Sequence, residues 1–465
     1  MAHRRPATAA RHLLEAADRS RSGPHRMSVH PPGTAWHADV VGKLHRTARQ
    51  RPDHPAVIDR HGTTSFRSLY LAAARQAQDL ESRPDHGAGV AVLRAAPSAA
   101  FFIQVCAALM VGRTPLVLPA RAPETEALRA VQTARSAGCR PWKAVLAVSG
   151  HQQVPVVTHG ESPAAPRKAR ALGMLPGGRA LFAAPMHLNG PFEFALRQLL
   201  LGGCIILAPR FEAEQWLESV RGHKPDWAFL VPTQIQQVWD ARPPRELRGD
   251  CSSLRLLLQS SAPCPPPLRQ RLTDVLGPER VAEYYGTTLY DGTVSPYTSR
   301  GPGGSPLPET ELRIVDPNRW PVAAGTPGTI EGRSRTGLIS HRADQPCASR
   351  PQWQSVGDRG RRIKDTDRIE VTDVAVPGRA IVAGVKIAVA ETHDTLSAHP
   401  AVRDCEIRVS PHDRFGSVLS AVVHTEDPAL TPSILRTWCA QRLTPPQRPH
   451  AIELRRTAAL DHATL

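Results

Sequence analysis

Short runs of apolar residues alternate with segments of helical length along most of the chain. Five such runs, each four or five residues long and rich in Leu, Ile, Val and Ala, lie at 89–93, 115–118, 204–207, 227–231 and 254–258. Short, mainly apolar runs are typical of strands that are buried on both faces, and intervening helices connect such strands in parallel. The pattern therefore predicts an α/β fold with a large body of βα units and covered sheets.

The beginning of this body has a recognisable order of elements. We expect a helix from about residue 44, then two short strands, and a second helix after them. A histidine and a glycine between the strands indicate a hairpin turn. The strands, the turn and the second helix are placed at 56–58 and 64–66, at His61-Gly62 and at 68–80.

The pattern changes after about residue 310. Short strands and glycine-rich turns follow, for example at 311–315 and 328–331, and predict a β-rich subdomain that runs to about residue 376. In the last hundred residues, strand-like and helix-like segments are mixed, which predicts a small C-terminal α+β lobe. The strand-like segments are 382–387, 402–409 and 418–424, and the helix-like ones are 390–398 and 432–442.

These changes divide the chain into three parts. Residues 1–26 are rich in Arg, His, Ala and Ser and have no apolar segment of the secretory-signal type, so we predict a disordered basic tail. Residues 27–372 should form the large N-terminal domain and residues 373–465 the small lobe, with a cleft between them. No run approaches the roughly 18 to 20 apolar residues of a membrane-spanning helix. We therefore expect no membrane partner.

Charge and cysteine content exclude further classes of function. The formal net charge is +16, but the basic residues are mostly arginines scattered along the chain, which argues against a nucleic-acid partner. The eight cysteines form no CxxC pair and no Cys/His set with zinc spacing. They predict reduced, mostly buried thiols in a cytoplasmic protein.

Several motifs occur in an order and spacing that are specific in combination. They lie at 55–58, 64–66, 185–192, 202–211, 231–233, 252–265, 277–288, 353–358 and 399–402. Together they resemble the adenylate-forming superfamily of acyl-CoA synthetases, peptide-synthetase adenylation domains and luciferases, and most closely its AMP-dependent acid–CoA ligase branch. The resemblance covers about residues 40–460.

The resemblance implies a two-step reaction. Family members join a carboxylate to the α-phosphate of ATP with release of pyrophosphate, and then pass the acyl group to a thiol. It implies ATP or AMP as a ligand, a small-molecule acid as substrate, and coenzyme A, an acyl carrier protein or another partner enzyme as acceptor. The implied substrate-pocket residues are His187, Asn189, Phe192, Gln234, Ser261, Ala262 and Pro263.

The family's glycine-rich phosphate loop is altered in this chain. Thr158, Gly160 and Ser162 remain as candidate phosphate contacts. Pro163 stands where the second glycine belongs, removing an amide donor, and Glu161 places a negative charge beside the phosphates. An ordinary surface loop is the alternative interpretation of this stretch.

The next family motif, Tyr-Gly-x-Thr-Glu, is only partly kept. Tyr285, Gly286, Thr287 and Thr288 match its first positions and are implied nucleotide contacts. Leu289 replaces the glutamate that helps to hold Mg²⁺, and a leucine cannot ligate a hard cation, which takes oxygen donors. We therefore assign no metal ligand.

Two aspartates and one altered position complete the comparison with the family. Asp358 matches the aspartate that holds the ribose hydroxyls, although an aspartate that caps a turn would look the same. Asp291 could replace the lost metal glutamate only if its turn were reshaped. The catalytic lysine of the family corresponds to Asp461, whose negative charge would repel the reactants. The catalytic residue is therefore unknown.

Two interpretations remain open. The first is a divergent acyl- or aryl-acid ligase with a rebuilt or impaired ATP site, acting on a carboxylic or other acid of specialised metabolism. The second is a non-catalytic pseudoenzyme that binds an acyl or aromatic ligand or a partner enzyme. Under both, we expect Thr287, Thr288 and Asp358 to face one cleft lined by residues 261–263.

Overall fold

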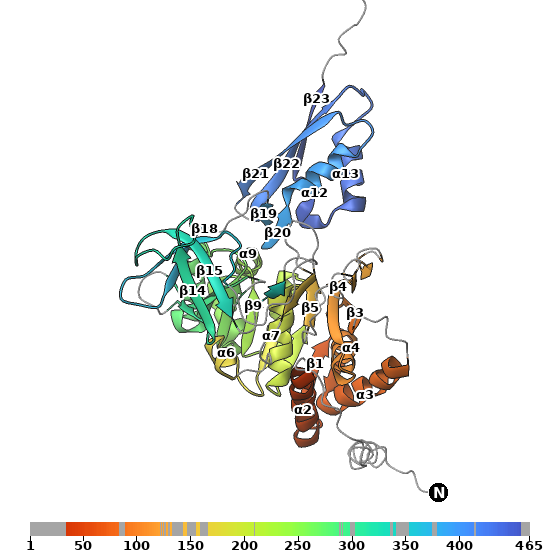
Figure 1. Ribbon diagram of the computed structural model, residues 1–465, viewed down its shortest axis with the longest axis vertical. Coiled ribbons are helices and arrows are strands. Elements are labelled where there is room, and N and C mark those ends of the chain that lie inside the picture. Colours follow the sequence, from red (N-terminus) through yellow and green to blue (C-terminus); the bar gives the residue numbers. More distant parts are fainter. Residues whose placement is uncertain are drawn as a thin grey trace, which may run out of the picture.

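A computed structural model gives the fold of most of the chain. The described residues are 34–82, 89–120, 122, 124, 127–128, 131–132, 143–146, 155–158, 166–208, 210–287, 290, 292–297, 303–334, 338–340, 353–373, 379–412 and 415–456. The predicted tail at 1–26 lies outside them. A large body carries a smaller part, coloured blue in Figure 1, that contains the last strands and helices of the chain.

The first described elements confirm the predicted helix, strand pair and helix. Helix α2 begins earlier than expected because Val40, Leu44 and Ala48 already form its buried stripe. Strands β1 and β2 are antiparallel, and their turn lies at Arg60 and His61, one residue before the predicted one. The bounds are α2 Thr34–Gln50, β1 Pro55–Asp59, β2 Gly62–Ser65 and α3 Phe66–Ser82.

A nine-stranded sheet forms the centre of the body. Its order is β13-β12-β11-β10-β9-β7-β8-β1-β2, and the six strands from β11 to β1 run parallel. This confirms the predicted βα units. The further strands are β7 Arg179–Phe182, β8 Cys204–Leu207, β9 Trp227–Leu230, β10 Leu256–Ser260, β11 Val281–Tyr285, β12 Thr293–Pro296 and β13 Ser305–Pro306. The helices are α7 Asn189–Leu200, α8 Ala213–His223, α9 Pro232–Ala241, α10 Pro244–Asp250 and α11 Pro266–Leu276.

A five-stranded sheet in the order β16-β6-β5-β4-β3 lies beside it. Helix α4 joins the two sheets, because its rings Phe101 and Phe102 pack against Phe192 of α7. Ser98 caps this helix by accepting a hydrogen bond from the Phe101 amide. The bounds are β3 Val90–Ala95, α4 Ala99–Met110, β4 Thr114–Pro119, β5 Lys143–Leu146, β6 Pro155–Thr158, α6 Pro166–Ala171 and β16 Leu338–Ser340.

The predicted β-rich subdomain is a four-stranded antiparallel sheet. Its order is β14-β15-β17-β18, and β14 and β15 include the strands expected at 311–315 and 328–331. The bounds are β14 Thr310–Val315, β15 Gly328–Ser334, β17 Arg359–Arg362 and β18 Ile369–Asp373.

The C-terminal part is an α+β unit with a core of its own. Its sheet has the order β20-β19-β22-β21, and a fifth strand, β23, runs parallel to β22 and pairs with it. Helices α12 and α13 cover this sheet (Figure 1). The bounds are β19 Arg379–Val382, β20 Val385–Ala388, α12 Val389–Ser397, β21 Asp404–His412, β22 Gly416–Thr425, α13 Pro432–Arg442 and β23 Ala451–Arg456.

One predicted strand in this part is wrong. The apolar segment 382–387 is a hairpin, in which Ala383 and Gly384 form the turn between β19 and β20. Both residues have positive φ, 51° and 77°, as a tight hairpin turn requires. Alanine is not a residue that marks such turns, so the apolar pattern hid it.

The same turn is where the C-terminal part contacts the body. A Cβ on Gly384 would lie 3.0 Å from the Cβ of Val231, the residue just before α9. Figure 1 shows the strands β19 and β20 at this junction, above the large sheet. A side chain at this position would press on Val231, and the positive φ also favours glycine.

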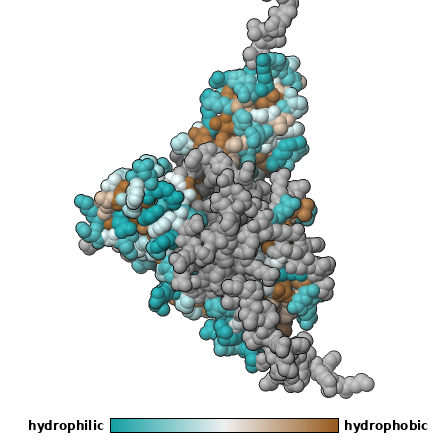
Figure 2. All heavy atoms as spheres, viewed as in Figure 1, coloured by the Kyte–Doolittle hydropathy of each residue, from teal (hydrophilic) through white to brown (hydrophobic). Residues whose placement is uncertain are grey.

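The surface, the hydrophobicity of the helices and the cysteines add three observations. Hydrophobic residues on the face drawn in Figure 2 form separate patches among hydrophilic ones. No helix in the described part of the chain has the length and hydrophobicity needed to cross a bilayer. Six described cysteines are free, and burial is the main cause that raises the pKa of Cys106, Cys204 and Cys251 to about 12.

Candidate functional site

Several of the predicted site residues lie around the carboxyl edge of the nine-stranded sheet. His187 follows β7, Val231 follows β9, Ser261 follows β10 and Gly286 follows β11. In parallel α/β sheets, this edge is where loops from separate strands converge and where ligands bind. The fold thus gathers residues that are up to a hundred positions apart in the sequence.

A buried contact joins Tyr285 to Asp358. The Tyr285 hydroxyl donates to Asp358 Oδ2 over 2.8 Å, and the Tyr290 hydroxyl lies 3.3 Å from the Tyr285 hydroxyl. Asp358 has no exposed surface. Burial raises the pKa of Tyr285, and the nearby Tyr290 and Asp358 add to the rise, so the phenol keeps its proton. The predicted ribose aspartate is therefore held by a protein donor.

Thr287, two residues after Tyr285, forms hydrogen bonds with Tyr290. Its amide donates to the Tyr290 carbonyl over 3.2 Å, and its hydroxyl accepts from the Tyr290 amide over 3.2 Å. These bonds close a small turn after β11. Thr288, Leu289 and Asp291 lie outside the described residues.

His187 lies in the loop between β7 and α7. Its ring is largely buried, and burial lowers its pKa to about 4, so the imidazole is uncharged at neutral pH. Asn189 is the half-buried first residue of α7. Phe192 is fully buried and packs on α4, so its ring belongs to the core.

Gln234 ties two loops of the site together. Its Oε1 accepts from the Val231 amide over 3.1 Å, and its Nε2 donates to the Ala183 carbonyl over 3.2 Å. The side chain thus fixes the start of α9 to the segment that follows β7. Both of its polar ends already have protein partners.

The segment after β10 projects outward. Ser261 has a φ of 75°, a left-handed conformation that costs a residue with a side chain free energy. Ser261 and Pro263 are exposed and Ala262 is half-buried. The Gln259 side chain donates to the Ala262 carbonyl and holds this turn.

Little of the predicted phosphate loop is described. Thr158 is the last residue of β6 and pairs with Lys143 and Leu338 on the neighbouring strands. Gly160 and Ser162 lie outside the described residues, as does Asp461. The described part of the chain contains no group of three or more His, Cys, Asp or Glu side chains that could hold a metal.

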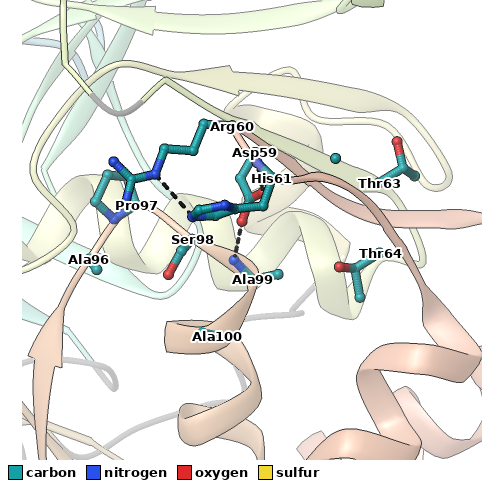
Figure 3. Close-up of a pocket in the computed structure, with 11 residues that line it drawn as sticks. Asp59, Arg60, His61, Thr63, Thr64, Ala96, Pro97, Ser98, Ala99 and Ala100 are labelled. Carbon is teal, nitrogen blue, oxygen red and sulfur yellow. Dashed lines mark hydrogen bonds between the residues drawn. The ribbon is translucent and has the colours of Figure 1, made fainter.

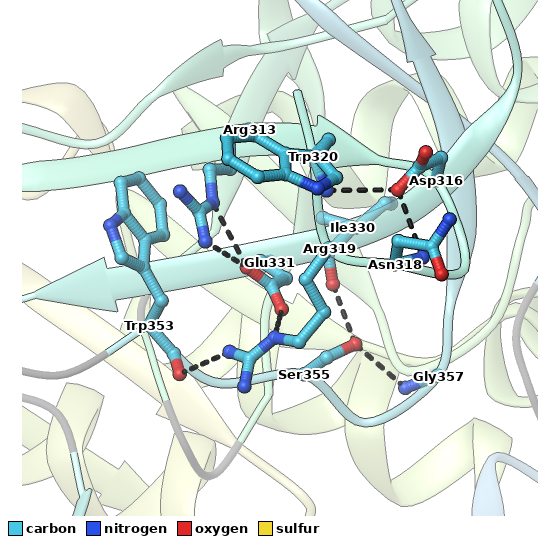
Figure 4. Close-up of polar contacts among 10 residues, drawn as sticks. All are labelled: Arg313, Asp316, Asn318, Arg319, Trp320, Ile330, Glu331, Trp353, Ser355 and Gly357. Atoms are coloured by element: carbon cyan, nitrogen blue, oxygen red, sulfur yellow. Dashed lines mark hydrogen bonds and ion pairs between the residues drawn. The ribbon is translucent and has the colours of Figure 1, made fainter. Parts of the chain in front are cut away.

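The four-stranded sheet contains an ionic network that the sequence pattern did not indicate. The buried carboxylate of Glu331 accepts from Arg313 over 2.6 Å and from Arg319 over 2.7 Å (Figure 4). Arg319 also donates to the Trp353 carbonyl, and the Arg313 guanidinium stacks 4.3 Å from the Trp353 ring centre. The network anchors the segment that leads to Asp358.

A surface cavity of about 400 Å³ was also missed from the sequence. It lies between the β1–β2 turn and the start of α4 (Figure 3). Its Asp59 accepts from the amides of His61 and Ala99, each over 2.8 Å, and Arg60 donates to His61 over 3.0 Å. None of the predicted site residues lines this cavity.

Comparison with known proteins finds a matching family model and several relatives. Residues 155–337 match the model of the AMP-binding enzyme family. A feruloyl-CoA synthase from Amycolatopsis sp is 28% identical over 299 residues, which are 59% of this chain and 57% of that protein. A 4-coumarate–CoA ligase from Oryza sativa subsp. japonica is 24% identical over 282 residues, 55% of this chain and 48% of that protein. In sequence, the chain is thus similar to members of the adenylate-forming superfamily.

Solved structures show the same fold. The amide bond synthetase of Marinactinospora thermotolerans has a TM-score of 0.75 at 21% identity, covering 91% of this chain and 96% of that one. A malonyl-CoA ligase with methylmalonyl-CoA and AMP bound has a TM-score of 0.71 at 22% identity, covering 87% and 96%. The curated relatives are matched over only about half their length. The sequence similarity is to acyl-CoA and aryl-acid ligases, and the solved structures show that the chain shares their fold.

Proposed function

We propose that this protein is a divergent acyl- or aryl-acid ligase in which ATP-dependent activation of the acid is lost or strongly slowed. Its sequence similarity to acid–CoA ligases supports an acid-binding site. One observation carries the second half of the proposal: Asp358 is fully buried and its carboxylate accepts the Tyr285 hydroxyl. A ribose would have to displace this hydrogen bond.

The sequence supports the same conclusion from three other positions. Leu289 replaces the implied metal glutamate, Pro163 interrupts the phosphate loop, and Asp461 replaces the implied lysine. One misplaced charge contact can slow a reaction by roughly a hundred- to a thousand-fold. The losses affect one reaction centre, so they should compound even if they are not additive.

The remaining parts of the site would serve an acid and its acceptor. The acid would lie near His187 and residues 261–263, and Thr287 with Thr288 would face any nucleotide that binds. Coenzyme A is the acceptor that the relatives' names favour, a carrier-protein thiol is a further proposal, and the amide bond synthetase raises an amine as an alternative. We further propose two domains divided near residue 372, and a reducing, cytoplasmic location that the free thiols support.

A non-catalytic binding protein is the second candidate. The observation that favours it is the self-satisfied state of the described site, where Tyr285, Thr287, Gln234 and Asp358 all bond to protein groups. Such a site would retain a ligand-binding edge without the contacts needed for turnover. Both candidates bind an acid without exchange, so the restored variant described below distinguishes them: it should regain exchange if the chain is a ligase and stay at background level if it is only a binding protein.

Pyrophosphate exchange tests the proposal. We expect the protein to show exchange at background level with magnesium, ATP and a panel of fatty, aromatic and dicarboxylic acids. Calorimetry with the same acids should still detect binding. The matched variant combines Leu289→Glu with Asp461→Lys and a glycine-rich loop at 158–168, and should regain exchange. Robust exchange by the unmodified protein would show that its ATP site is intact.

A further inference from the structure

Tyr284 lies in β11, next to Tyr285 of the candidate site. It is the last residue but one of β11, and successive side chains of a strand point to opposite faces. Tyr285 reaches Asp358 on one side, whereas Tyr284 contacts Phe194 of α7 on the other. Tyr284 therefore lies on the opposite side of β11 from the contact between Tyr285 and Asp358.

The ring of Tyr284 extends along the strand toward its carboxyl end. A Cβ placed on Gly286 would lie 2.2 Å from the Tyr284 hydroxyl oxygen and 2.4 Å from its Cζ. A side chain at position 286 would therefore require this ring to move. The hydroxyl thus sits against the backbone of the Tyr-Gly-Thr motif, at the edge where the predicted site residues gather.

Beneath Tyr284 the interior is filled by aromatic rings. The Phe194 ring meets Tyr284 edge-on with centres 5.6 Å apart, and it also contacts Trp227 at 5.9 Å and Phe229 at 5.8 Å. Phe194, Trp227 and Phe229 are at most 3% exposed. Close-packed rings of this kind leave no room for a chain to pass between α7 and the sheet.

We propose that Tyr284 sets the upper length of the acid that the site accepts, so that the ligand is a short-chain or single-ring carboxylic acid. This inference rests on the proposed function, because it assumes that the acid lies at this edge. An acid entering between α7 and β11 meets the Tyr284 ring and, behind it, the Phe194 layer. A longer chain has to displace the ring.

Three variants and a homologous series of acids test this assignment. Calorimetry measures the binding of straight-chain acids from two to twelve carbons, with benzoate and 4-phenylbenzoate. The wild-type protein should bind the short acids and benzoate only. Tyr284→Ala should extend the series, with affinity rising about fourfold for each added methylene. Tyr284→Phe, which keeps the ring, should retain the wild-type limit.

The outcomes separate this inference from the proposed function. If no acid binds to any variant, the acid-binding function fails and the assignment fails with it. If acids bind but Tyr284→Ala keeps the wild-type length profile, or if the wild type binds the long acids, only the role of Tyr284 is refuted. Melting temperatures check folding, and Tyr284→Leu replaces the alanine variant if that one does not fold.

Discussion

The Asp358 carboxylate has no contact with solvent, and it accepts a hydrogen bond from the hydroxyl of Tyr285 in β11. A buried carboxylate needs such donors, because burying an unpaired charge is strongly unfavourable. Tyr285 is the donor that provides this compensation, and Tyr290 in turn contacts Tyr285. At this residue scale, the same groups that the family resemblance assigns to a nucleotide stabilise the protein itself.

Removing the Tyr285 hydroxyl tests this role. Tyr285→Phe should lower the free energy of unfolding by about 1.5 to 3 kcal/mol, the usual range for a hydrogen bond to a charged group. Urea denaturation gives the value. Tyr290→Phe is the matched control, and its smaller effect is expected because its 3.3 Å contact does not reach the carboxylate directly. Equal stability of Tyr285→Phe and wild type would contradict the role.

Among the elements, the four-stranded sheet depends on one buried acid. Glu331 is 3% exposed and links Arg313 of β14 with Arg319 of the following loop, while Arg319 holds the Trp353 segment. Arg319 adopts a left-handed φ of 67°, which such a tether can maintain. The network ties β14 and β15 to the Trp353 segment, which leads through Asp358 into β17 of the same sheet.

Glu331→Gln should therefore destabilise the protein. We expect a loss of about 2 kcal/mol, less than a fully buried ion pair because the two arginines are partly exposed. Thermal and urea unfolding provide the measurement. The Glu311–Arg333 pair offers a control with exposed partners, and Glu311→Gln should cost no more than about 1 kcal/mol. Similar losses in both variants would rule out a special role for Glu331.

Elements whose signals are local could be predicted from the sequence. The apolar run 204–207 and the segment 432–442 coincide with β8 and α13, because one is buried on every side and the other starts with a capping threonine, Thr431, and a proline. The turn at Ala383 escaped prediction because its conformation is set by the partner strands, since alanine has no preference for it. Local patterns thus fixed strands and helices better than the turns between them.

The candidate site follows the same rule. Its backbone positions could be predicted, since motif order placed Tyr285 and Asp358 in one family site, and they do meet across 73 positions. Their contact with each other could not, because hydrogen-bond partners depend on the packing of separate sheets. The Glu331 network and the cavity near Asp59 also join residues distant in sequence, and no motif marks them.

At the scale of the whole molecule, the turn at Gly384 is one place where described residues of the two parts come into contact. Gly384 combines a positive φ with a close approach to Val231 of the large body. Gly416 in the same C-terminal sheet also has a positive φ, of 72°, but a Cβ there would have its nearest contact at 3.7 Å, to the Ile381 carbonyl. Gly416 therefore serves as a control for backbone strain alone, whereas Gly384 combines this strain with contact between the two parts.

Gly384→Ala should lose more stability than Gly416→Ala. Both substitutions impose the left-handed penalty of about 1 to 2 kcal/mol. The first also forces a methyl group against Val231, and this additional loss should shrink in the double variant with Val231→Ala. Unfolding curves for the four proteins measure the difference. If both glycine variants lose the same stability, the turn does not press on the body.

The contact between Gly384 and Val231 also bears on the rate at which an acid enters and leaves the site. Val231 adjoins the carboxyl edge where the acid is proposed to lie, and the hairpin turn covers it. If the acid lies there as proposed, its entry and departure from this side would depend on how often the C-terminal strands lift away, and loop and domain motions of this kind occur in microseconds to milliseconds. The residence time of the acid would then depend on a glycine in this turn, which is not itself one of the proposed binding residues.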